Sequence, residues 1–104
     1  MIDFFKNIFS NSPKADLGEL ISKGAMIIDV RSPGEYKGGH LKNSTNIPLD
    51  QLSGKIGKLD KNKPVITCCA SGMRSASAKS ILLSNGFKEV HNGGGWTNLL
   101  KYDK

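Results

Sequence analysis

Two short apolar runs constrain the fold of this chain more than any other feature of the sequence. Residues 25–30 read AMIIDV and residues 65–68 read VITC, and both runs are rich in β-branched side chains. Each run is too short for a helix of its own, and neither alternates strictly between apolar and polar residues. This pattern is typical of strands that are buried on both faces, as in the middle of a parallel sheet.

Helical patterns lie before, between and after the two runs. Residues 14–23 predict a short helix that ends at Gly24, and residues 75–84 predict a longer one that ends at Asn85-Gly86. The other expected elements are a helical turn around 35–37, a strand over 46–49, a weak helix over 50–59, a strand over 87–91, a loop over 93–95 and a helix over 96–102. Strands that alternate with helices predict an α/β fold with a central, mostly parallel sheet and helices on both faces.

Length and charge are those of one small globular domain. The chain has 104 residues and a net charge of +6, with its lysines scattered rather than gathered in a block. A solvated surface explains this charge, and attraction of a small anionic substrate is the alternative. We find no nucleic-acid motif, and no apolar run approaches the length of a membrane span.

Cysteine usage indicates a reducing compartment, and we expect a cytoplasmic protein. Cys68 and Cys69 are adjacent, which is a poor framework for disulfides. His40 and His91 show no ligand spacing with them, so no metal site and no cofactor are expected.

The first residues form a separate apolar segment. Residues 1–12 are expected to be an amphipathic extension and residues 13–104 the folded domain, because apolar residues at 1, 2, 4, 5, 8 and 9 form one helical stripe. The segment lacks the basic start and cleavage site of a signal peptide. It is expected to pack on the domain or on another chain, and contact of residues 1–11 with a membrane surface is the alternative.

The segment 65–80 has the pattern of a strand, a loop and a helix, with Cys69 just after the strand. Crevices at the carboxyl ends of parallel strands are where such sheets bind ligands. Residues 70–72 are small, so their N–H groups can point inward, and a helix that begins near Ser75 adds its own. We therefore expect Cys69 to have a lowered pKa, to be thiolate near neutrality and to be exposed. Arg74 adds a permanent positive charge.

The neighbouring Cys68 is interpreted as a small buried hydrophobe, because successive residues of a strand point to opposite faces. A resolving thiol and a vicinal disulfide with Cys69 are the alternatives, and the disulfide would strain the intervening peptide. For Cys69 itself the alternative is an inert thiol at a helix start.

Four motifs occur in one order along the chain. They are Asp29-Val30-Arg31 with Glu35-Tyr36 and Gly39-His40-Leu41; Asn46-Ile47-Pro48-Leu49; Cys69-Ala70-Ser71-Gly72-Met73-Arg74-Ser75; and Gly93-Gly94-Gly95-Trp96. Together they resemble the first signature, the following strand and turn, the active-site loop and the second signature of single-domain rhodaneses, which are thiosulfate sulfurtransferases. The resemblance covers about residues 14–102.

This resemblance implies a rhodanese-like fold and transfer of sulfur through a persulfide on Cys69. The thiolate would attack the outer sulfur of an anionic donor such as thiosulfate and release sulfite. Cyanide, a thiol or a protein would then accept the sulfur. Ala70, Ser71 and Met73 would line the mouth of the loop. Arg74 would either bind the sulfonate of the donor or form a structural ion pair with Glu35 or Asp29.

Four residues of the first motif are expected to support the site. Asp29 and Arg31 end the first buried strand, and an ion pair between Arg31 and Glu35 is expected to hold the loop region in shape. His40 is interpreted as a hydrogen-bonded structural residue rather than a general base. Trp96 is expected in the core or in a wall of the cleft.

Three other functions compete with sulfur transfer by an independent enzyme. The domain could be a sulfur carrier or interaction module that delivers persulfide sulfur to a protein partner. Phosphatases of a related fold have a similar loop that is one residue longer, and the four residues between Cys69 and Arg74 disfavour phosphate chemistry. A redox or arsenate-type thiol enzyme would need Cys68 as a second working thiol.

Overall fold

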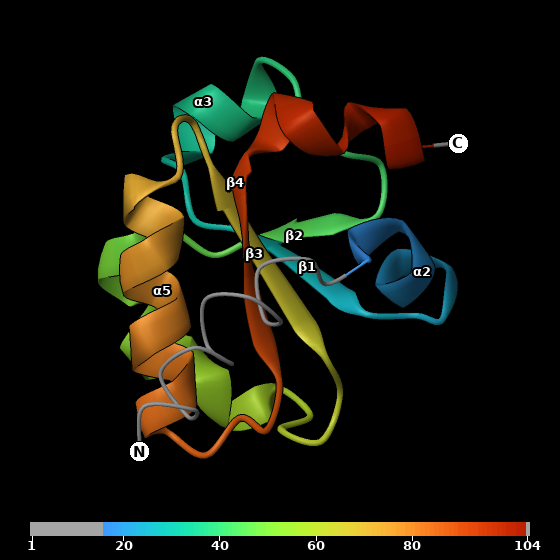
Figure 1. The fold of residues 1–104 in the computed structure, drawn as a ribbon. Coiled ribbons are helices and arrows are strands. Elements are labelled where there is room, and N and C mark those ends of the chain that lie inside the picture. Colours follow the sequence, from blue (N-terminus) through green and yellow to red (C-terminus); the bar gives the residue numbers. More distant parts are fainter. Residues whose placement is uncertain (1–15, 104) are drawn as a thin grey trace, which may run out of the picture.

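The computed structural model describes residues 16–103, and in this part four strands form one parallel sheet in the order β2-β1-β3-β4 (Figure 1). The central pair is β1 (Met26–Asp29) and β3 (Val65–Cys69), and the edges are β2 (Ser44–Asn46) and β4 (Val90–Gly95). The two apolar runs are therefore the two inner strands. The predicted α/β fold with a parallel sheet is confirmed.

Helices cover both faces of the sheet (Figure 1). One face carries α5 (Met73–Ser84) and α4 (Leu52–Lys55), with α4 flanked by the 3₁₀ turns η2 (Leu49–Gln51) and η3 (Ile56–Lys58). The other face carries α2 (Leu17–Ser22) and the 3₁₀ helix η4 (Trp96–Tyr102). The short helix α3 (Pro33–Lys37) follows the carboxyl end of β1.

The core is divided by the sheet into two clusters. Ile28 and Cys69 belong to the cluster under α5, whereas Ile27 and Cys68 belong to the cluster under α2 and η4. Neighbouring strand residues thus point to opposite faces, and both faces are buried. This is why the strand sequences are apolar without alternation.

Several element boundaries differ from the prediction. The strand expected over 46–49 lies at 44–46, and the one expected over 87–91 lies at 90–95 and includes the three glycines expected to form a loop. Helix α5 begins at residue 73 rather than 75. The glycines fit a strand here because of packing: a Cβ on Gly93 would lie 2.9 Å from Ile66 Cγ2. Sequence preferences do not reveal this, since glycine is rare in strands.

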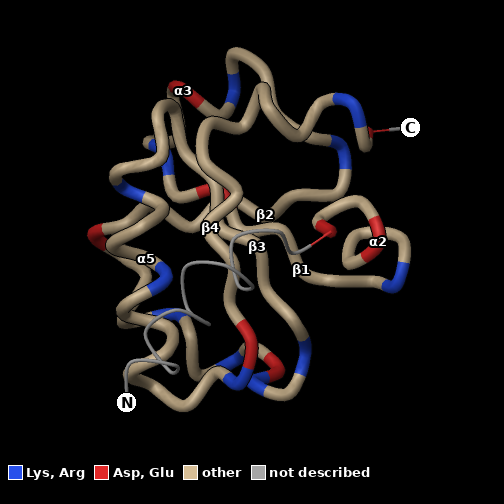
Figure 2. The backbone as a smooth tube through the Cα atoms, viewed as in Figure 1, with Lys and Arg blue, Asp and Glu red and all other residues tan. Residues whose placement is uncertain are grey.

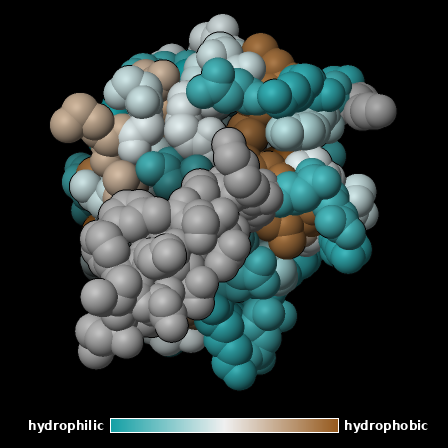
Figure 3. Space-filling view, in the orientation of Figure 1, coloured by the Kyte–Doolittle hydropathy of each residue, from teal (hydrophilic) through white to brown (hydrophobic). Residues whose placement is uncertain are grey.

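Lys, Arg, Asp and Glu are spread along the described chain rather than gathered in one segment (Figure 2). In the view of Figure 3, hydrophobic colour on the described atoms is limited to small patches. Among the described helices, none is both long and apolar enough to cross a membrane. The expected amphipathic extension of residues 1–12 lies outside the described residues.

Candidate active site

Cys69 is the last residue of β3, where the strand meets the loop that leads into α5. It lies opposite Gly95 of β4. Gly72 makes the turn into the helix with a φ of +105°, a left-handed conformation that strains any residue with a Cβ. The backbone therefore requires glycine at position 72. The turn at Gly72 directs N–H groups back toward Cys69.

The Cys69 sulfur sits in a ring of donors. Its Sγ accepts hydrogen bonds from the Gly72 N–H at 2.9 Å and the Ser75 N–H at 3.3 Å. Burial acts to raise the pKa of Cys69. Hydrogen bonds from the Ser75 side chain and from the N–H groups of Ser75, Gly72 and Ser71 outweigh burial and lower this pKa overall. The sulfur is thus held in an environment that favours the thiolate.

The expectation that Cys69 is exposed is wrong. Its residue is 0% exposed, and its side chain packs in the core cluster under α5. The reason is geometric: Cys69 continues β3 for one more residue, so its side chain points into a face of the sheet rather than out of the loop. The N–H groups of Gly72 and Ser75 thus bond to a sulfur that is closed off from solvent.

Asn92 of β4 is a residue of this site that the sequence analysis missed. Its Oδ1 accepts hydrogen bonds from the Ser75 hydroxyl at 2.6 Å and from the Gly94 N–H at 2.8 Å, and its Nδ2 donates to the Gly72 carbonyl at 3.2 Å. The Ser75 Oγ in turn lies 3.5 Å from Cys69 Sγ. Asn92 therefore ties the loop and Ser75 to the neighbouring strand. An asparagine before three glycines carries no sequence signal for this role.

Asp29 and Arg31 form a buried ion pair at the carboxyl end of β1. Asp29 is 0% and Arg31 is 4% exposed, and Arg31 Nη2 lies 2.8 Å from Asp29 Oδ2. Arg31 also donates to the carbonyls of Glu35 and Gly39, and its guanidinium lies 4.7 Å from the centre of the Trp96 ring. The predicted pair between Arg31 and the Glu35 carboxylate is therefore wrong. Asp29 is the nearer partner, and it compensates the buried charge.

The Glu35 carboxylate instead pairs with Arg74. The two contacts, Nη1–Oε1 at 2.7 Å and Nη2–Oε2 at 3.0 Å, give a bidentate geometry. Glu35 also caps α3, since its Oε1 accepts from the Ser32 N–H and hydroxyl. The hydrogen bond from Arg74 and those from Ser32 lower the pKa of Glu35 to about 2. Arg74 thus links the active-site loop to α3.

The other predicted site residues take distinct positions. Ala70, Ser71 and Met73 are exposed around the loop, with Met73 80% exposed. His40 Nδ1 donates to the Tyr36 carbonyl at 2.7 Å, and its ring stacks on Tyr36. His40 therefore bonds to α3, the helix that precedes it. Cys68 faces the opposite cluster, where burial, followed by the charge of Asp29, raises its pKa to about 12.

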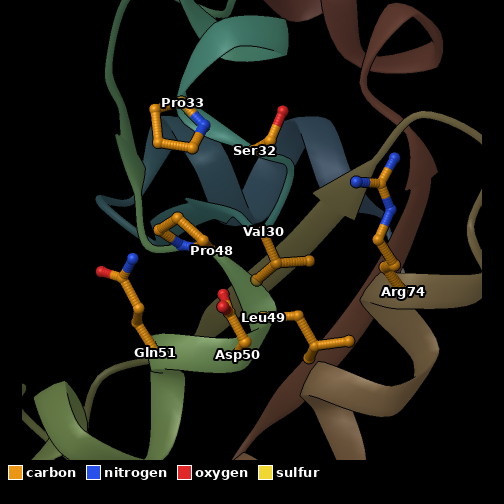
Figure 4. A pocket seen from close by; sticks show the side chains of 8 residues that line it. All are labelled: Val30, Ser32, Pro33, Pro48, Leu49, Asp50, Gln51 and Arg74. Atoms are coloured by element: carbon orange, nitrogen blue, oxygen red, sulfur yellow. The ribbon is translucent and has the colours of Figure 1, made fainter.

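An open groove of about 430 Å³ lies beside the loop (Figure 4). Its lining residues are Val30, Ser32, Pro33, Pro48, Leu49, Asp50, Gln51 and Arg74. Val30 belongs to the core cluster that contains Cys69, and Leu49 packs against that cluster. Among residues 16–103, no three His, Cys, Asp or Glu side chains are grouped as metal ligands.

The chain matches the model of the rhodanese-like domain over residues 13–101. It belongs to the rhodanese-like family. Thiosulfate sulfurtransferase GlpE of Stutzerimonas stutzeri is 30% identical over 94 residues, which are 90% of this chain and 86% of that protein. Thiosulfate sulfurtransferase PspE of Escherichia coli is 40% identical over 70 residues, 65% of this chain and 67% of that protein.

A third relative is longer than this chain. YqhL of Bacillus subtilis is 41% identical over 68 residues, which cover 65% of this chain and 54% of YqhL. Among solved structures, a rhodanese-related protein of Thermoplasma volcanium is 37% identical with a TM-score of 0.72, covering 83% of this chain and 85% of that one. The human single-domain sulfurtransferase TSTD1 has a TM-score of 0.74 at 23% identity. The match covers 85% of this chain and 92% of TSTD1, and it shows the shared fold.

Proposed function

We propose that this protein is a sulfurtransferase that carries sulfane sulfur on Cys69. The observation that carries the proposal is the Cys69 sulfur in its ring of N–H donors, with a lowered pKa. The relatives named as thiosulfate sulfurtransferases support thiosulfate as the donor. In the first step the Cys69 thiolate attacks the outer sulfur of thiosulfate, the S–S bond of the donor breaks, and its electron pair leaves with sulfite.

In the second step a thiol acceptor, as its thiolate, attacks the outer sulfur of the persulfide. The bond between Cys69 Sγ and that sulfur breaks, the transferred sulfur keeps the proton that it carried in the protonated persulfide, and Cys69 leaves as a thiolate. The loop N–H groups stabilise Cys69 as leaving group for the same reason that they stabilise it as nucleophile. Cyanide would accept the sulfur in the same way and leave as thiocyanate.

Burial of Cys69 adds a conformational step to this scheme. Cys69 is 0% exposed and its sulfur is bonded to the Gly72 N–H, so we propose that a donor reaches the sulfur only after the loop over residues 70–72 moves outward. Arg74 bridges to Glu35 across the same region, so we propose that an anionic donor exchanges with Glu35 at the guanidinium. The cytoplasmic location expected from the sequence fits a thiol that must stay reduced.

The decisive experiment is the intact mass of the protein after incubation with thiosulfate and desalting. We expect a gain of one sulfur atom that is lost when cyanide is added. The variant Cys69→Ser should show no gain, whereas Cys68→Ser is the matched control and should load like the unmodified protein, because Cys68 faces the other cluster. Absence of any gain on the unmodified protein, or loading that depends on Cys68, would overturn the proposal.

A further inference from the structure

The groove beside the active-site loop offers an anionic donor one cation, Arg74, at the end where the donor is proposed to exchange with Glu35. Its walls are mostly apolar, formed by Val30, Pro33, Pro48 and Leu49, and two charged residues, Asp50 and Arg74, lie on its border (Figure 4). Arg74 is already neutralised by its bidentate pair with Glu35. The groove is therefore left with the charge of Asp50.

Asp50 has no ion-pair partner among residues 16–103. It stands at the turn η2, next to Leu49, whose N–H is held by the Val30 carbonyl at 3.1 Å. This backbone bond fixes the turn to the end of β1, so the carboxylate is presented by a rigid support. An unpaired carboxylate beside apolar walls favours a ligand with an apolar body and a positive charge.

The groove adjoins the segment that holds Cys69. Arg74 lines the groove and belongs to the active-site loop, and Val30 packs in the same cluster as Cys69. Met73, the residue before Arg74, is 80% exposed, although methionine is a hydrophobic side chain. An exposed methionine on the loop offers apolar contact area to a polypeptide, which a small thiol does not need.

From these observations we infer that the groove binds the acceptor, and that the acceptor is a cysteine-bearing segment of a partner protein with a basic residue next to the cysteine. The basic side chain faces Asp50, and the apolar part of the segment lies on Val30, Pro48 and Leu49. This inference rests on the proposed function and names its second substrate. It also predicts that thiols carrying carboxylates are poor acceptors.

The test uses three blocked pentapeptides that have a central cysteine flanked on both sides by Lys, Gln or Glu. Protein loaded with thiosulfate is desalted, its added sulfur is confirmed by intact mass, and the rate of sulfur loss to each peptide is measured. We expect the rate to be highest with the Lys peptide, intermediate with the Gln peptide and lowest with the Glu peptide. The variant Asp50→Asn should reduce the advantage of Lys over Gln by about two- to fivefold, the size of an exposed ion pair. High salt should reduce it in the unmodified protein as well.

Two comparisons make this result specific. The ratio of rates between the unmodified protein and Asp50→Asn cancels the intrinsic reactivity of each peptide thiol. Asp60→Asn removes an exposed carboxylate that does not line the groove, and it should leave the peptide order unchanged. An equal effect of both variants, or a peptide order that Asp50→Asn does not alter, would refute the inference. The small aminothiol cysteamine is assayed beside the peptides, and a dependence on Asp50 that is confined to cysteamine would show that the occupant is not a polypeptide.

Binding measured without sulfur transfer separates this inference from the proposed function. Labelled peptides with Ser in place of Cys are titrated with unloaded protein, and anisotropy is recorded. Tighter binding of the Lys peptide that Asp50→Asn weakens would support the groove even if no persulfide forms on Cys69. Equal binding of the Lys and Glu peptides would reject the groove even if the persulfide forms.

Discussion

At the scale of single residues, the ionisation of Cys69 depends on a small number of donors. Most of them are backbone N–H groups, such as those of Gly72 and Ser75, which a side-chain substitution does not remove. The side-chain group is the Ser75 hydroxyl, which lies 3.5 Å from Sγ and donates to Asn92 Oδ1. A hydroxyl has one proton, so it accepts from the Cys69 thiol while it donates to Asn92, and it can rotate toward the sulfur when the thiol ionises.

We expect Ser75→Ala to raise the pKa of Cys69, because one donor to the thiolate is lost while the backbone donors remain. Thiolate is present above the pKa, so the rate of alkylation rises with pH through that value and then levels off. In Ser75→Ala this rise should move to higher pH, as should the thiolate absorbance. Ser80→Ala changes an exposed serine on the same helix and should leave the midpoint in place. An unshifted midpoint in Ser75→Ala would show that the hydroxyl does not stabilise the sulfur.

At the scale of elements, the active-site loop and β4 are packed without space between them. A Cβ on Gly95 would lie 2.7 Å from the Ala70 carbonyl oxygen, and one on Gly72 would lie 3.4 Å from Gly94 Cα. The glycines of β4 thus let a strand pass directly beside the loop that holds Cys69. This contact, and the bonds from Asn92, keep the loop N–H groups aimed at the sulfur.

Gly95→Ala should therefore disturb the loop although its own backbone is unstrained, with a φ of −67°. We expect a loss of about 1–3 kcal/mol in the free energy of unfolding, typical of overpacking, together with slower persulfide formation on Cys69. Gly54→Ala is the control, because Gly54 is in α4 and a Cβ there meets nothing within 4 Å. This control should raise stability by about 0.5–1 kcal/mol. Chemical denaturation and the mass assay measure both effects, and an undisturbed Gly95→Ala would contradict the packing argument.

At the scale of the whole molecule, stability comes from a sheet that is covered on both faces. Helix α5 covers much of one face of the sheet, and Leu82 on its inner side is 0% exposed. Its neighbour Leu83 points outward and is 45% exposed. Both residues are leucines in α5. Comparing the same substitution at the two positions therefore separates the effect of burial from the effect of helix propensity.

We expect Leu82→Ala to lower the free energy of unfolding by about 2–5 kcal/mol, because it leaves a cavity under α5. Leu83→Ala should change it by no more than about 0.5 kcal/mol, as is usual at exposed positions. Urea denaturation of both variants measures the difference. Similar losses in the two variants would mean that the core is not organised around this face of α5.

The sequence by itself determined the parallel α/β fold, the two inner strands and the placement of Cys69 where a strand leads through a short loop into a helix. Those features follow from local patterns: apolar runs without alternation, small residues after a strand, and helical spacing. The fold decided the partners across the chain. Arg31 pairs with Asp29, whereas sequence proximity suggested Glu35, and of the two carboxylates that the sequence offered to Arg74 the fold selects Glu35. Asn92, the enclosure of Cys69 and the groove at Asp50 also depend on segments far apart in the chain, whose distances only the packed sheet sets.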